Sequence, residues 1–318
     1  MTTGEAEVGR NLAQVDAQSR ARVRKPRRPS LEGNWWRHLV ALIAVVAALF
    51  PVVFIVSSAF NRDNTLSGAQ VIPTHVTLHN FGNLLHNNVS TSGGGKADAP
   101  YVKWVINSMI VAGVTAFFST MLGALAAYAF SRFRFRGRRM GMVALLLIQM
   151  FPQIVAVAAI YLLMLNVGGI FRPLSLNSLL AVIVVYLGGA MGVQTWLMKG
   201  FFDTIPKELD ESARVDGATA SQIFWGVILP LAAPVLVVVA LISFVFTLNE
   251  FVIASALLQT NDHFTLPVGM QGFISQQYGQ RWGPFAAGSL MAMIPVVLLF
   301  LFLQRWIVSG LTAGSVKG

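Results

Sequence analysis

The chain has no cysteine and few charged residues. Among its 318 residues there are no Cys and five scattered His, which excludes disulfide scaffolds, thiolate metal sites and cysteine nucleophiles and leaves no cluster with which to bind a metal. Only 11% of the residues are charged, whereas soluble globular domains carry about 25%. Since 55% of the residues are hydrophobic and the mean hydropathy is +0.65, the sequence predicts an all-α integral membrane protein.

Signatures of catalysis are missing as well. The sequence contains no Gly-x-x-x-x-Gly-Lys-Ser/Thr phosphate loop, so the chain is not expected to use ATP by itself. No nucleophile and base stand in a catalytic pattern, and no cofactor is expected. The net charge of +10 is not accompanied by a recognisable nucleic-acid module, so nucleic acid is not an expected partner. The sequence therefore points away from an enzyme.

Six apolar runs are long enough to cross a bilayer. The first, 39–59, has 21 residues without a charge, which matches the ~20 that a spanning helix needs. The others are expected at about 104–130, 140–165, 179–197, 231–257 and 285–303. A cleaved signal peptide is the alternative for the first run. That run is longer than the ~7–15 residues of a signal core and lies far from the N-terminus, so it is expected to stay in the mature protein.

The basic residues predict the orientation of these spans. Of the 23 Lys and Arg, 18 fall in the two terminal segments and in the loops 131–139 and 199–230, and five fall in the opposite loops. Because basic loops stay in the cytoplasm, both termini are expected there. Residues 1–38 then form a disordered basic cytoplasmic arm, 60–101 an extracytoplasmic loop and 306–318 a cytoplasmic tail.

The loop 199–230 is unusually polar for a connection between two spans. It holds five of the 13 acids, and its pattern predicts two short helices rather than a simple turn. Thr204 is placed to cap a helix that runs to about Val215, and Gly217 is placed to end it in the left-handed conformation. Thr219 with Gln222 three residues later predicts a capping box for the second helix.

The first of these helices needs a surface to pack against. Asp210 and Arg214 are four residues apart and are expected to pair, while Leu209, Ala213 and Val215 form a small apolar face. A helix of ~10 residues is marginal on its own in water. Either a partner protein binds it, or it is only a structured connection.

The same loop carries a family signature. The signature is written as EAA, three residues, G, nine residues, I, one residue and LP. The loop matches this spacing in full, with Ser212 in place of the first alanine and Val227 in place of the isoleucine. The matching residues are Glu211, Ser212, Ala213, Gly217, Val227, Leu229 and Pro230. The loop thus resembles the cytoplasmic loop of the transmembrane subunits of binding-protein-dependent ABC importers.

This resemblance implies an architecture and a set of partners. The fold would be the type I ABC importer permease fold with six transmembrane helices, its core at 102–305, in the cytoplasmic membrane. The seven matching residues would couple the permease to a dimeric ATP-binding subunit, where ATP would be hydrolysed. A second permease subunit, an extracytoplasmic solute-binding protein and the lipid bilayer would be the other partners.

The C-terminal segment suggests a substrate class. Residues 304–318 resemble the C-terminus of the smaller permease subunit of maltose and maltodextrin importers, which implies oligosaccharide import. Trehalose, another sugar or glycerol phosphate stays open as the substrate. An ion-coupled secondary transporter is the rival class. It would be expected to show repeated halves and several intramembrane acids, whereas this chain has one such acid.

Polar side chains within the spans are candidate pathway or gate residues. Gln149 and Gln153 flank Pro152 in the third apolar run, and Asn249 precedes Glu250 in the fifth. Polar groups inside a bilayer usually face the interior of the helix bundle. For Glu250 a structural hydrogen bond or a position near the outer interface is an equal alternative.

The loop 259–284 is rich in amides and aromatic residues. Such side chains hydrogen-bond to sugars and stack on them, and they are also ordinary for an exposed loop. The resemblance implies that this loop reaches the solute-binding protein. The candidate contacts are Gln271, Gln276, Gln277 and Tyr278.

Overall fold

The computed structural model describes residues 35–61, 76–90, 96–275 and 281–313, with the backbone alone at 90, 96–97, 190–191 and 307–313. Residues 1–34 of the predicted N-terminal arm, 314–318 of the tail and the candidate contacts Gln276, Gln277 and Tyr278 lie outside the described residues.

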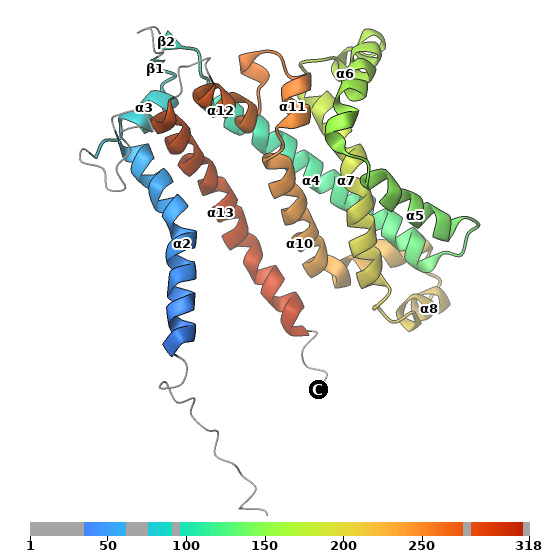
Figure 1. Cartoon of the computed structure of the whole chain (residues 1–318). Helices are drawn as coiled ribbons and strands as arrows, with labels where there is room; N and C mark the ends of the chain where they lie inside the picture. The colour runs from blue at the N-terminus through green and yellow to red at the C-terminus, as the bar shows by residue number, and fades with distance from the viewer. Residues whose placement is uncertain (1–34, 62–75, 91–95, 276–280, 314–318) are drawn as a thin grey trace, which may run out of the picture. The chain divides into compact units, whose positions relative to one another are not determined.

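Helices dominate the described chain (Figure 1). In chain order the elements are α2 (Trp35–Phe60), α3 (His79–Leu85), β1 (Val89–Ser90), β2 (Lys96–Ala97), α4 (Tyr101–Arg132), α5 (Arg138–Gln149), α6 (Gln153–Ile170), η3 (Arg172–Leu174), α7 (Leu179–Phe202), α8 (Glu208–Val215), α9 (Ala220–Ile223), the π-helical segment η4 (Phe224–Ile228), α10 (Leu229–Leu248), α11 (Val252–Leu257), η5 (Asn261–His263), α12 (Leu266–Ile274) and α13 (Trp282–Ala313). The two-residue strands β1 and β2 pair antiparallel, with Val89 opposite Ala97. The all-α expectation is thus correct except for this small hairpin.

Five of the described helices are long and apolar enough to cross a membrane, namely α2, α4, α6, α13 and the stretch Ala220–Leu248 that includes α10. A sixth is α7, if its halves Leu179–Gly189 and Gly192–Phe202, which meet at 49°, count as one span. Their surfaces expose many large apolar side chains, such as Phe246 at 78% and Ile154 at 71%. A water-soluble monomer rarely exposes so much contiguous apolar surface, so these surfaces fit lipid or another membrane helix.

The third predicted span is interrupted. The sequence favoured one helix over 140–165, whereas the structure ends α5 at Gln149 and starts α6 at Gln153. Pro152 has no N–H to donate and disfavours helical geometry at the residue before it. The break therefore falls where the backbone chemistry of Pro152 places it, and two helices stand where one span was expected over 140–165.

The fifth predicted span is interrupted as well. It was expected over 231–257, but α10 ends at Leu248 and α11 begins at Val252. No proline stands at this break. Instead the carboxylate of Glu250 accepts hydrogen bonds from the N–H groups of Ile253 and Ala254, at 2.9 and 3.2 Å. A side chain that satisfies the first free N–H groups starts a new helix at that position.

Helices α4, α7 and α10 pack against one another along their lengths. At the end of α4 where α3, α12 and α13 also meet, Trp104 is fully buried and its ring nitrogen donates to the carbonyl of Asn261 at 2.8 Å. Tyr101 donates to the carbonyl of Gly288, also at 2.8 Å. These contacts fix the start of α4 to the segments that follow α10.

Gly269 on α12 provides the space for Trp104. A Cβ added at Gly269 would come within 2.2 Å of the indole ring. We therefore expect Gly269→Val to lower the midpoint of thermal unfolding of the purified protein, since overpacking a core costs about 1–3 kcal/mol. Gly113→Val is the matched control, because a Cβ there meets nothing within 4 Å. An equal midpoint for both variants would contradict this packing.

Candidate functional site

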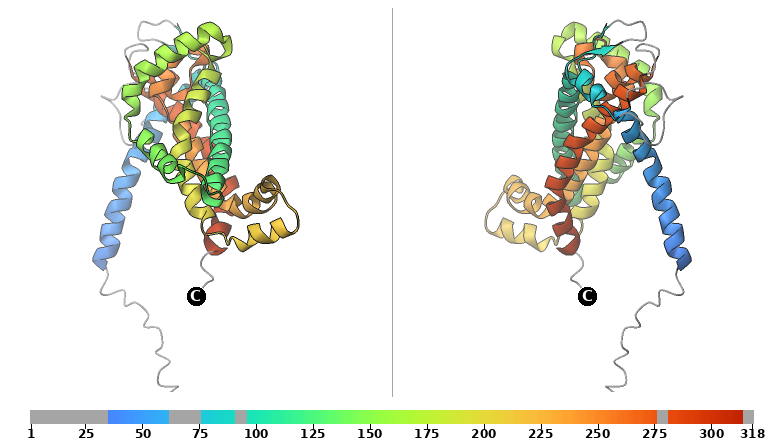
Figure 2. Two further views of the ribbon diagram at one scale, coloured as in Figure 1. Left: turned by 90° about the vertical axis from the view of Figure 1, so that its right-hand side faces the viewer. Right: turned by 90° about the vertical axis from the view of Figure 1, so that its left-hand side faces the viewer.

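The polar loop folds into two short helices, α8 and α9, that extend away from the long helices (Figure 2). The prediction that Thr204 caps the first helix was wrong. Its hydroxyl instead donates to the carbonyl of Phe201 at 2.7 Å, and α8 begins at Glu208. Thr204 therefore belongs to the end of α7, because a hydroxyl can bond back to the carbonyl three residues earlier as readily as it can cap.

The predicted junction between the two helices is confirmed. Gly217 has φ +83°, and Ala218 donates its N–H to the carbonyl of Ala213 at 2.9 Å. Thr219 and Gln222 form the expected capping box, in which the N–H of Thr219 donates to Oε1 of Gln222 at 2.8 Å. Both features depend on neighbours within a few residues.

The sequence suggested that Asp210 pairs with Arg214, but the structure gives it another partner. Its carboxylate lies 2.8 Å from Nε of Arg132, the last residue of α4, and both side chains are only 3% exposed. The contact does not meet the angle of a well-aligned hydrogen bond, so it is mainly an ion pair. Arg132 also donates to the carbonyl of Ile205 at 3.0 Å. α8 is thereby attached to the end of α4 in an environment where charges interact strongly.

A second set of polar contacts joins α7 to α4 beside this pair. Ser131 donates to Asp203 at 2.7 Å, and Lys199 forms an ion pair with the same carboxylate. Partial burial would raise the pKa of Asp203, but the hydrogen bonds from Lys199 and Ser131 and the charge of Lys199 outweigh it and hold the pKa below its usual value. Asp203 is therefore an anion at neutral pH.

Beneath α8 and α9 lies an apolar cluster that draws on α4, α7, α9, η4 and α10. Tyr128 of α4 packs on Phe224 with ring centroids 5.1 Å apart. Ala213 and Ala218 pack against this cluster, whereas Leu209 and Val215 are 41% and 88% exposed. Of the predicted apolar face of α8, only Ala213 lies inward.

The remaining residues of the sequence signature divide between surface and core. Glu211 and Ser212 of α8 are exposed, and so is Pro230 in the first turn of α10. Val227 and Leu229 are half-buried against the same apolar cluster. Val227 lies in the π-helical segment η4, a rare geometry that is frequent at functional sites.

The family model for the inner membrane component of binding-protein-dependent transport systems matches residues 119–312, which include this whole loop. The chain belongs to this family. It is a permease subunit of an ABC importer, as the loop signature predicted, and ATP hydrolysis takes place in a separate subunit. Family membership decides against the ion-coupled secondary transporter.

The permease has relatives over most of its length. It is 40% identical to the galactooligosaccharides transport system permease protein GanQ of Bacillus subtilis (strain 168), over 88% of this chain and 94% of the relative. It is 38% identical to the maltose/maltodextrin transport system permease protein MalG of Escherichia coli (strain K12), over 88% of this chain and 95% of the relative. A bacterial ABC transporter that imports alginate has the same fold, with a TM-score of 0.69 and 20% identity over 88% of this chain and 99% of that one.

The candidate pathway glutamines lie on either side of the break between α5 and α6. Gln149 donates from Nε2 to the carbonyl of Gly189 at 2.9 Å, so it fastens the end of α5 to the bend in α7. A Cβ at Gly192 would come within 2.8 Å of the same nitrogen. Gln153 is exposed at the start of α6. The two side chains therefore differ in their surroundings. Gln149 is held by a hydrogen bond within the permease, and Gln153 is exposed on the surface of the described chain.

Glu250 makes structural hydrogen bonds. Besides capping α11, it accepts the hydroxyl proton of Tyr186, a buried residue of α7. Its neighbour Asn249 is exposed and donates to the carbonyl of Val245 at 2.8 Å. These contacts favour the structural alternative for Glu250 over the gate.

We expect Glu250→Gln to keep uptake and to lose less stability than Glu250→Ala, because its amide oxygen still accepts from Ile253 although its amide nitrogen cannot accept from Ala254. Glu250→Ala should lower stability by about 1–3 kcal/mol, since it leaves buried donors unpaired. Thermal unfolding and solute uptake measured on both variants test this. Loss of uptake in a stable Glu250→Gln variant would instead support a gate that needs the charge.

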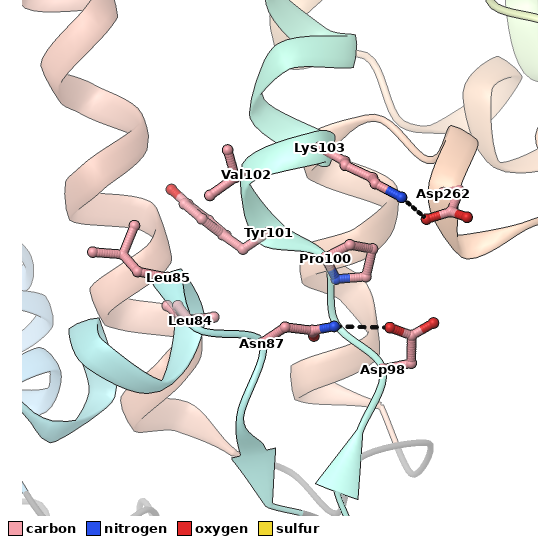
Figure 3. Close-up of a pocket in the computed structure, with 9 residues that line it drawn as sticks. All are labelled: Leu84, Leu85, Asn87, Asp98, Pro100, Tyr101, Val102, Lys103 and Asp262. Atoms are coloured by element: carbon pink, nitrogen blue, oxygen red, sulfur yellow. Dashed lines mark hydrogen bonds and ion pairs between the residues drawn. The ribbon is translucent and has the colours of Figure 1, made fainter.

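At the opposite end of α4 from the polar loop, Gln271 is exposed on α12. Near the start of α4 a cavity of about 270 Å³ is lined by residues of α3, α4 and η5 and of the segments between them (Figure 3). Lys103 and Asp262 form an exposed ion pair at its edge, 2.7 Å apart. The hydrogen bond and the charge of Lys103 hold the pKa of Asp262 below its usual value.

One polar cluster inside the helix bundle was not predicted. Gln194 of α7 donates to the hydroxyl of Ser119 on α4 at 3.1 Å, and that hydroxyl lies 3.0 Å from the hydroxyl of Ser243 on α10. All three side chains are buried. The sequence signal was weak, because a single Ser or Gln in an apolar run does not reveal which helix it faces.

Proposed function

We propose that this permease is the smaller membrane subunit of a heterodimeric importer of oligosaccharides, working with a dimeric ATPase and an extracytoplasmic solute-binding protein. The observation that carries the proposal is the family signature on α8, held to α4 by the buried pair Arg132–Asp210. A short helix with an exposed carboxylate at Glu211 and a rigid attachment to the spans is suited to transmit movement of a partner.

The proposed topology has six spans and both termini in the cytoplasm. The bent helix α7 counted as one span brings the number to six. The eight Lys and Arg of the loops 131–139 and 199–230 support a cytoplasmic position for the end of α4 that carries α8. Within this topology, residues 102–305 form the core of the permease, and the segments 1–38, 60–101 and 306–318 are the arm, the outer loop and the tail.

The coupling mechanism follows from the contacts of α8. Closure of the ATPase dimer would displace α8, and the pair Arg132–Asp210 would pass that displacement to α4. The same movement reaches α10 through η4, since Phe224 packs on Tyr128 of α4. The free energy available to switch the permease between its inward- and outward-facing states is then limited by the difference in the ATPase's affinity for those two states.

An oligosaccharide is the proposed substrate, because the two relatives described above are named for galactooligosaccharides and for maltose and maltodextrin. Maltodextrin is the first candidate, since the C-terminal segment resembles that subunit, and galactooligosaccharide is the second. Trehalose and glycerol phosphate are less favoured.

The test is uptake in vesicles that contain this permease with its neighbouring subunits and binding protein. We expect ATP-dependent uptake of a labelled maltodextrin that stops when the ATPase is inactivated. Uptake driven by an ion gradient without the ATPase would contradict the proposal. Titration of the binding protein with maltotriose, a galactooligosaccharide and trehalose then separates the substrates.

A further inference from the structure

A groove of about 980 Å³ runs between α5 and the second half of α7. Cationic side chains lie at one end of it, called the mouth here: Arg138 and Arg139 are the first residues of α5, and Lys199 lies near the end of α7. Apolar side chains of Met142, Val143, Leu146 and Trp196 line the rest. Leu146 is eight residues beyond Arg138, about 12 Å along the helix axis, so the groove extends from the polar end of the molecule into the apolar zone.

The charges at this mouth are not balanced by the chain itself. Asp203 is the one acid among the lining residues, and it already pairs with Lys199. No ion pair among the described residues involves Arg138 or Arg139. Arg138 donates to the carbonyl of Ser131 at 3.5 Å and acts on Asp203 through its charge alone. The first turn of α5 contains no acid, although a helix N-terminus favours anions and disfavours cations.

We propose that this groove binds an anionic phospholipid, with the phosphate at Arg138 and Arg139 and one acyl chain along Met142, Val143, Leu146 and Trp196. The inference rests on the proposed topology, which places this mouth in the cytoplasmic leaflet, where anionic lipids attract basic clusters. A helix of a partner subunit is the alternative occupant, and it would shield Trp196 from both lipids in the test below.

Trp196 gives a reporter inside the groove. The assembled transporter is placed in bilayers that contain either phosphatidylglycerol or phosphatidylcholine brominated on the acyl chain. Tryptophan quenching is compared between the unchanged chain and Trp196→Phe, since the chain has seven Trp. We expect the brominated anionic lipid to quench Trp196 at mole fractions roughly tenfold lower than the zwitterionic lipid, from the charge of two arginines near a headgroup.

Two pairs of variants test the separate parts of the groove. Arg138→Gln with Arg139→Gln should abolish the preference for the anionic lipid, whereas Arg134→Gln with Arg136→Gln, in the same loop but outside the lining, should keep it. Gly200 also lines the groove, and a Cβ there meets nothing within 4 Å. Gly200→Leu should therefore reduce quenching by both lipids with the charges intact. Gly113→Leu, on α4 and equally free of clashes, should not.

Equal quenching by the two lipids would overturn the proposal, and so would a preference for the anionic lipid that survives loss of both arginines. No quenching by either lipid would also overturn it, since it would mean that protein covers the groove. Loss of the preference on adding millimolar inorganic phosphate would assign the site to a free anion instead. Uptake measured on the same vesicles keeps the two proposals apart, because oligosaccharide transport can persist when lipid preference is absent.

Discussion

Asp210→Ala is expected to lower the stability of the permease by about 3–5 kcal/mol, because removing one member of a buried ion pair leaves the other charge uncompensated. Arg132 and Asp210 are each only 3% exposed, so the remaining guanidinium could not reach water without moving α8. The measurement is the midpoint of thermal unfolding of the purified membrane subunits without the ATPase. A fall of roughly 5–10 °C is expected for a loss of this size.

Two further variants show whether the unpaired charge is the cause. Asp216→Ala removes an exposed acid just beyond the last turn of α8 and should change stability by no more than about 0.5 kcal/mol. Arg132→Met combined with Asp210→Leu removes both charges and should recover most of the loss, since an apolar replacement of a buried pair is often neutral. If the double variant is as unstable as Asp210→Ala, the interpretation fails.

Glu211→Lys is expected to reduce uptake at least about tenfold, the effect of losing one interaction of ~1.4 kcal/mol, while ATP hydrolysis continues. Glu211 is exposed on α8, so reversing its charge should leave membrane insertion and stability unchanged and act on the contact with the ATPase. The ratio of solute imported to ATP hydrolysed in reconstituted vesicles measures this uncoupling. Asp216→Lys makes the same change of charge outside the helix and should keep the ratio closer to that of the unchanged permease.

Gly217→Val tests the same coupling through geometry. A Cβ at Gly217 meets no atom within 4 Å, but its φ is +83°, and this conformation costs a residue with a side chain about 1–2 kcal/mol. We expect the end of α8 to shift and the coupling ratio to fall while the spans stay folded. Normal uptake by both Glu211→Lys and Gly217→Val would count against the assignment of α8 as the coupling helix.

Features set by neighbours in the chain could be predicted from the sequence. Gly217 takes a left-handed conformation, and Thr219 with Gln222 forms a capping box, because each depends on backbone groups within a few residues. The long apolar runs likewise gave the helices of the membrane region, since a helix satisfies its own backbone in lipid. The family signature needed only residue types at fixed spacing.

Features that join distant parts of the chain were missed. The sequence offered Asp210 a partner four residues away, yet it pairs with Arg132, 78 positions earlier. Glu250 bonds with Tyr186 from another helix and divides a run that hydropathy treated as one span. Hydropathy is averaged over a window of residues, so it does not detect a single side chain that accepts hydrogen bonds from backbone N–H groups.

The sequence by itself determined that this protein is a helical membrane permease and where its polar signature loop lies, because hydropathy and turn chemistry act over short distances along the chain. Only the tertiary structure decided which charge holds α8, where the fifth run breaks, and which cations gather at the mouth of the groove between α5 and α7. Burial makes that difference, since a charged side chain finds its partner only when packing brings a distant segment beside it and removes the water between them.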